Sequence, residues 1–86
     1  MTMVHLLYFS WVRERVGKSE EMRDLPSDVA TVAGLIDYLK SQGDQYAAAL
    51  EDIQHIRVAV NQTHSSAEHP VTDGDEVAFF PPVTGG

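Results

Sequence analysis

The chain has 86 residues, which is enough for one domain with one hydrophobic core. It contains no cysteine, so disulfides, thiolate metal ligands and a cysteine nucleophile are excluded. Its net charge is −7 and its six basic residues are scattered, which argues against nucleic-acid binding and favours either a basic protein partner or a role in solubility alone. No apolar run is long enough to span a membrane, and the N-terminus lacks the pattern of a signal peptide. We therefore expect a cytoplasmic protein without a membrane partner.

The first elements are predicted to be a strand, a short helix and a second strand. Residues 3–9 are rich in strand formers and are apolar at odd and even positions, as in a central strand. The following segment "WVRERVG" predicts a short helix capped by Ser10 and ended by Gly17. Residues 20–25 form a weakly patterned second strand that stops at Pro26.

The clearest predicted element is an amphipathic helix in "TVAGLIDYLKSQG". Thr31 or Asp28 can cap its start, and Gly43 stands where a left-handed residue would end it. Gly34 inside the helix suggests a close approach by another backbone. A second, short helix is expected from a cap at Asp44. The apolar stripe of the main helix consists of Val32, Leu35, Ile36 and Leu39.

The remainder predicts two strands separated by a turn-rich stretch. "IRVAVNQ" reads as a strand, "DGD" at 73–75 as a hairpin turn, and "EVAFF" at 76–80 as the last strand. The first and last strands are both apolar on two faces, so we expect them to be neighbours in the middle of the sheet. The order predicts an α+β protein with a mixed sheet and one main helix packed on one face, which is the β-grasp arrangement.

Side chains that could carry chemistry are weakly grouped. The four histidines include no pair at i, i+4, and no G-x-S-x-G motif is present. The sequence therefore predicts no metal site, no cofactor bound by this chain and no catalysis by the chain on its own.

The last nine residues, "AFFPPVTGG", are different, because the chain ends on two glycines. At ordinary glycine usage such an ending arises by chance in about one chain in two hundred. Pro81 and Pro82 cannot continue a strand ladder and favour an extended backbone that could hold the terminal carboxylate roughly 18–20 Å from the sheet. Gly85 and Gly86 can thread a passage too narrow for a Cβ atom. We predict a domain of residues 1–80 with a flexible tail of residues 81–86.

A free terminal carboxylate is ionised at neutral pH and can attack the α-phosphate of ATP. The resulting adenylate is an activated acyl group that sulfur or nitrogen can attack. The sequence shows neither a phosphate-binding loop nor a set of magnesium ligands, so a partner would bind the magnesium and the ATP.

Three segments carry a family resemblance: "LLYFSWVRERVG", "AVNQT" and, most specifically, "HPVTDGDEVAFFPPVTGG". Together they resemble the small, sulfur-carrying subunits of molybdopterin synthase, which are ubiquitin-like β-grasp proteins. The resemblance implies that an E1-like enzyme adenylates Gly86 and that a sulfurtransferase system converts it to a thiocarboxylate. Its sulfur then goes to cyclic pyranopterin monophosphate to form the dithiolene of molybdopterin. Two small and two large subunits would form a heterotetramer whose catalytic side chains belong to the large subunit.

The residues expected to act are those of the tail. Gly86 would carry the sulfur and Gly85 would pass through the narrow entrance of the partner. Either Phe79 or Phe80 is expected to pack against the partner, while alternation turns the other one toward the helix. The tail would be aligned by Pro81, Pro82, Val83 and Thr84.

Alternative functions remain open at this point. The activated tail could form an isopeptide bond with lysines, as in a protein modifier, or carry sulfur for thiamine synthesis or tRNA thiolation. A binding module with an inert tail is the third possibility, and it predicts that removal of the two glycines has no effect.

Overall fold

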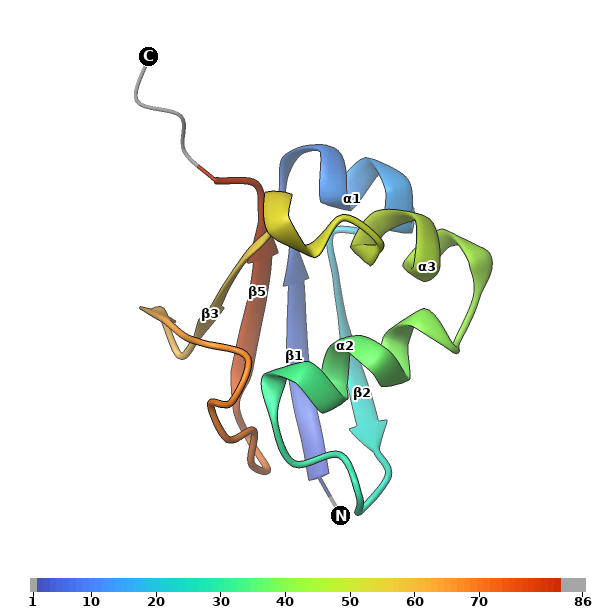
Figure 1. The fold of residues 1–86 in the computed structure, drawn as a ribbon. Coiled ribbons are helices and arrows are strands. Elements are labelled where there is room, and N and C mark those ends of the chain that lie inside the picture. The colour runs from blue at the N-terminus through green and yellow to red at the C-terminus, as the bar shows by residue number, and fades with distance from the viewer. Residues whose placement is uncertain (1, 83–86) are drawn as a thin grey trace.

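The computed structural model describes residues 2–82 and shows a five-stranded mixed sheet with helices (Figure 1). The strand order is β2-β1-β5-β3-β4. The elements in chain order are β1 (Thr2–Tyr8), α1 (Ser10–Val16), β2 (Glu20–Leu25), α2 (Val32–Lys40), α3 (Asp44–Leu50), the 3₁₀ helix η1 (Ile53–His55), β3 (Arg57–Val60), β4 (Thr63–His64) and β5 (Glu76–Phe80).

The first and last strands lie side by side in the centre of the sheet, as predicted. β1 pairs with β5 in parallel, with Leu6 opposite Val77 and Tyr8 opposite Phe79. β1 also pairs with β2, and β5 with β3, both antiparallel. Since a parallel pair cannot be joined by a tight turn, the chain between them supplies the helices that cover the sheet. This confirms the predicted β-grasp arrangement.

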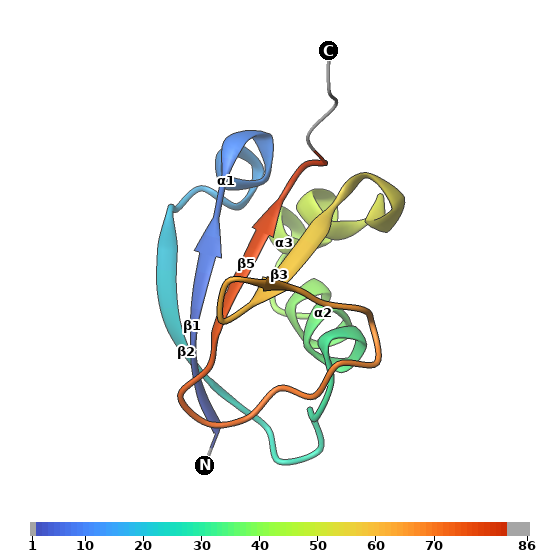
Figure 2. The same ribbon diagram turned by 90° about the vertical axis from the view of Figure 1, so that its left-hand side faces the viewer.

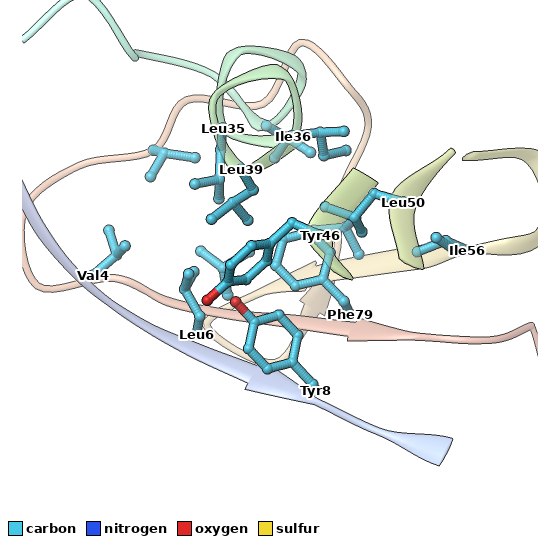
Figure 3. Close-up of a cluster of buried hydrophobic side chains, with 14 of the residues drawn as sticks. Val4, Leu6, Tyr8, Leu35, Ile36, Leu39, Tyr46, Leu50, Ile56 and Phe79 are labelled. Carbon is cyan, nitrogen blue, oxygen red and sulfur yellow. The ribbon is translucent and has the colours of Figure 1, made fainter. Parts of the chain in front are cut away.

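The core lies between the sheet and the helices. Figure 2 shows α2 and α3 on one side of the sheet, and alternate strand residues point toward them. Val4, Leu6 and Tyr8 of β1 are buried, as are Val77 and Phe79 of β5. Figure 3 shows how side chains from the strands and from α2 and α3 meet in this cluster.

The main helix follows the sequence pattern closely. All four residues of the predicted stripe of α2 are buried, and the Oγ1 atom of Thr31 accepts a hydrogen bond from the Gly34 amide at 3.1 Å. Thr31 is therefore the cap, rather than Asp28. The expectation of a close backbone approach at Gly34 is not met: a Cβ there would lie 3.5 Å from Oγ1 of Thr31 and 3.9 Å from Val29, which is ordinary van der Waals contact.

Three predicted helix ends are wrong. Gly43 does not end α2 in a left-handed conformation: α2 ends at Lys40 with the right-handed Ser41 as its C-cap, and Gly43 is extended and precedes α3. Asp44 is the first residue of α3 and does not cap it. Ser10 likewise lies inside α1, where no side chain caps the helix. α1 and α3 each begin one residue earlier than a cap at Ser10 or Asp44 requires. Gly17 ends α1 with φ 90°, as predicted.

The stretch before β5 contains a strand that the sequence pattern missed. Asn61 and Gln62 have φ values of 52° and 70°, the geometry of a two-residue hairpin turn, and they connect β3 to β4. The Asp-Gly-Asp segment is a turn but not a hairpin, because β4 and β5 are not neighbours. It fastens β1 instead: Oδ1 of Asp73 accepts from the Met3 amide at 2.7 Å, and the Gly74 amide donates to the Met3 carbonyl at 2.8 Å.

Candidate functional site

The candidate site begins where β5 ends. The strand runs through the middle of the sheet to Phe80, and the half-buried Pro81 and Pro82 follow it. In Figure 1 the chain leaves the sheet there, beside α1 and η1. Of the predicted tail, Val83, Thr84, Gly85 and Gly86 lie outside the described residues, so their roles stay predictions.

The end of β5 is firmly held from both sides. The Phe9 amide donates to the Phe79 carbonyl at 3.1 Å, and the ring of Phe79 stacks on Tyr8 with centroids 5.8 Å apart. On the other side, Arg57 of β3 is the register partner of Phe80. The end of β5, from which the tail starts, therefore has a fixed position and direction.

The two phenylalanines at this end have separate roles. Phe79 is 0% exposed and belongs to the core. Phe80 lies on the opposite face of the sheet, half-buried, with its ring edge-on to His64 at a centroid distance of 5.4 Å. Of the two candidates for partner contact, the fold therefore leaves Phe80, whose role in docking stays a prediction.

The face that carries Phe80 has a row of apolar side chains. Leu7 is the register partner of Ala78, which pairs in turn with Ala59 on β3. Phe9 continues the extended backbone of β1 and is 46% exposed, which is high for so large an apolar residue. We call this set the open-face patch: Leu7, Phe9, Ala59, Ala78 and Phe80.

Charged and polar groups border the patch. The Nε2 atom of His5 is hydrogen-bonded to Oε1 of Glu20 at 3.0 Å beside Leu7, and Glu76 is the register partner of His5. Arg57 stands at the other side, where its guanidinium donates to the Gln54 and Ile56 carbonyls at 3.4 Å. An apolar centre with a polar border is the usual make-up of a protein docking surface.

A polar cluster on the covered face supports the site from behind. The Oε2 atom of Glu21 accepts hydrogen bonds from the hydroxyls of Tyr8 at 2.8 Å and Tyr46 at 2.6 Å, and Arg23 donates to Oε1 at 3.3 Å. Burial alone would raise the pKa of Glu21, but these hydrogen bonds and the charges of Arg23 and Lys18 outweigh it and lower the pKa. Burial, then the hydrogen bond to Glu21, raises the pKa of Tyr8. The network ties β2, β1 and α3 together beneath the ring that stacks on Phe79.

The sequence prediction placed the site in the tail and missed most of the open-face patch. Leu7, Phe9, Ala59 and Ala78 were not singled out as site residues. The sequence signal for this patch is the second apolar face of the first strand. That two-sided pattern predicts a central strand, but it also predicts an apolar surface on the face away from the helices. Within residues 2–82, no group of three or more metal-binding side chains is found, and no helix in that range could cross a membrane.

The sequence matches the ThiS family over residues 6–86. The chain belongs to this family. It is 50% identical over 84 residues to the molybdopterin synthase sulfur carrier subunit of Escherichia coli K12, an alignment that covers 98% of this chain and 100% of that protein. The family resemblance and the ubiquitin-like form of the β-grasp fold are thereby confirmed.

Two solved structures extend this relationship. The small archaeal modifier protein 1 of Haloferax volcanii matches with a TM-score of 0.76 at 26% identity, covering 96% of this chain and 100% of that one. A chain from the complex of subunits 1 and 2 of molybdopterin-converting factor from Helicobacter pylori 26695 matches with a TM-score of 0.65 at 21% identity, covering 99% and 100%. The second match concerns the fold alone.

Proposed function

We propose that this chain is the sulfur carrier subunit of molybdopterin synthase and that the carboxylate of Gly86 is its working group. The carboxylate attacks the α-phosphate of ATP with release of pyrophosphate, and a sulfur donor displaces AMP to leave a thiocarboxylate. The sulfur is then passed to cyclic pyranopterin monophosphate in forming the dithiolene. The observation that carries this proposal is the 50% identity, over nearly the whole chain, to a molybdopterin synthase sulfur carrier subunit.

The geometry of the described residues is consistent with delivery by a tail. β5 is a central strand, held by β1 and β3, and the prolines begin at its end. A rigid origin reduces the conformational freedom that the tail loses when it enters a partner. The chain itself would contribute the reacting carboxylate and its positioning, while ATP and magnesium would be held by an E1-like enzyme.

The open-face patch is the proposed docking surface for these partners. It lies on the same strands that hold the origin of the tail, so a partner that covers Phe9 and Phe80 would also receive the chain end. Aromatic side chains are common energetic anchors in interfaces. The partners proposed are the large synthase subunit, with which two copies would form a heterotetramer, the adenylating enzyme and a sulfurtransferase. Catalytic side chains would belong to those partners.

Intact mass tests the proposal directly. Protein isolated from cells that make molybdenum cofactor is expected to include a species heavier by one sulfur-for-oxygen exchange, located in the last peptide. A variant that lacks Gly86 is the control: it should fold and yet never acquire the sulfur. A tail that remains the free acid after incubation with ATP, sulfide and the host's adenylating enzyme would refute the proposal.

A second candidate is a protein modifier, favoured by the structural match to the small archaeal modifier protein 1. Activation of Gly86 would be the same, but a lysine amine would attack the adenylate, displace AMP and form an isopeptide bond. Conjugates of higher mass that contain a Gly-Gly remnant on lysine, absent when Gly86 is deleted, would support it. Sulfur transfer without any conjugates would restrict the function to the first proposal.

A further inference from the structure

An ionisable side chain, His64, lies beside the apolar open-face patch. His64 is the second and last residue of β4, is exposed, and is the register partner of Ala59. Its ring meets Phe80 edge-on, with centroids 5.4 Å apart and planes at 62°. The imidazole therefore extends the surface that includes Phe80 toward the edge of the sheet.

This placement makes its protonation relevant to docking. A partner that packs on Phe80 also approaches the ring of His64, because the two rings are in edge-on contact. Removing an imidazole from water costs more when it is charged than when it is neutral, unless an opposite charge pairs with it. An imidazole takes up its proton near pH 6.5, within the range that cells and compartments reach.

The charged groups around His64 do not offer compensation for that charge. Arg57 of β3 lines the same hollow as His64 and is also cationic, and the residues of α2 that line it are the apolar Val32 and Ile36. On β5, Glu76 lies four residues before Phe80, paired in register with His5 rather than with β4. Within the described part of the chain, no salt bridge to His64 is found.

We propose that His64 makes docking of the open-face patch sensitive to protons, so that the chain binds its partner with His64 neutral and is released when His64 is protonated. The inference rests on the proposed function, because it needs a partner that covers Phe80. It assigns to His64 a role in partner binding rather than in catalysis. Acidification would slow sulfur delivery by weakening the complex, with the tail chemistry unaltered.

The experiment measures the dissociation constant for the large synthase subunit of the same host by calorimetry between pH 8.0 and pH 5.5. If the neutral form alone binds, each pH unit over which the free chain takes up the proton weakens binding by up to tenfold, so binding should be weaker at pH 5.5 than at pH 8.0. His64→Leu keeps an apolar side chain of similar size and should bind at pH 8.0 with a much smaller dependence on pH. Comparing the pH dependence of the dissociation constant in the two chains cancels any contribution from titratable groups of the partner.

His5→Gln separates the two histidines on this face and should retain the full dependence on pH. Thermal melts at both pH values establish that each variant is folded. An equal dependence on pH in the native chain and in His64→Leu, or tighter binding in acid, would overturn the inference and leave the proposed function intact. Loss of the dependence in His5→Gln would assign the effect to His5 instead. No binding at any pH would overturn both the docking surface and the role of His64.

Discussion

The two faces of the central strands differ in what covers them. Toward the helices, Val4, Leu6, Tyr8, Val77 and Phe79 are buried, and the polar atoms of Glu21 and the two tyrosines are hydrogen-bonded to one another. On the opposite face, the same strands carry Leu7, Phe9, Ala78 and Phe80, and Phe9 remains 46% exposed. Alternate residues of one strand thus contribute to the core on one face and to the proposed docking surface on the other.

Adjacent residues therefore offer a clean way to separate the two roles. Phe79 and Phe80 have the same side chain and the same strand, and differ only in the face to which they point. Substitutions of these two residues therefore test stability and recognition separately.

Phe79→Ala should destabilise the fold by about 3–5 kcal/mol, because it leaves a cavity in the core where Phe79 stacks on Tyr8. For a chain of this size that is a large share of the total stability. Denaturant unfolding followed by circular dichroism measures it. A loss below about 1 kcal/mol would mean that the core is able to close around the missing ring.

Phe80→Ala is expected to leave the free energy of unfolding within about 1 kcal/mol of the native value, since the ring is only half-buried. Binding to the large subunit should weaken by about 2 kcal/mol, as for an aromatic anchor at an interface. Calorimetry at pH 8.0 measures the binding. Unchanged affinity would exclude this part of the patch from the interface.

Glu21→Gln should destabilise the covered face by about 1–3 kcal/mol, because charge-assisted hydrogen bonds from two tyrosines and Arg23 are lost or weakened. The lowered pKa of Glu21 means that its contribution is present above pH ~4.3, the ordinary pKa of a glutamate, and is lost as the pH falls through the lower pKa of the folded state. Unfolding measured from pH 7 to pH 2.5 should show a smaller loss of stability in the variant than in the native chain. Parallel curves would show that Glu21 is not the group responsible.

Gly34→Ala should stabilise α2 by about 0.5–1 kcal/mol through helix propensity. The new methyl group meets Oγ1 of Thr31 at 3.5 Å, an ordinary contact. Affinity for the large subunit should not change, because α2 lies on the covered side. A rise in melting temperature with equal affinity would confirm that the two faces are independent, whereas weaker binding would contradict it.

Much of the fold could be predicted from the sequence, because its signals are local. The stripe from Val32 to Leu39 specifies an amphipathic helix, and the two-sided apolar pattern of the first and last strands places both in the centre of the sheet. The helix ends were harder. Gly43, Asp44 and Ser10 each suit a terminal role, but the connection between α2 and α3 and the entry to α1 decide the conformation there. β4 was missed because two residues make too short a pattern, and its hairpin turn has no glycine.

For the candidate site, the sequence by itself predicts the carrier chemistry, because the two prolines, two small residues and two glycines at 81–86 carry the resemblance to sulfur carrier subunits. Only the tertiary structure decided which residues surround the origin of that tail. Strand alternation requires Phe79 and Phe80 to face opposite ways, but only the packing of α2 and α3 on one face determines which of them is buried. The contact between His64 and Phe80 joins two residues from different strands, and such a pairing arises from sheet register, which no local pattern in the chain encodes.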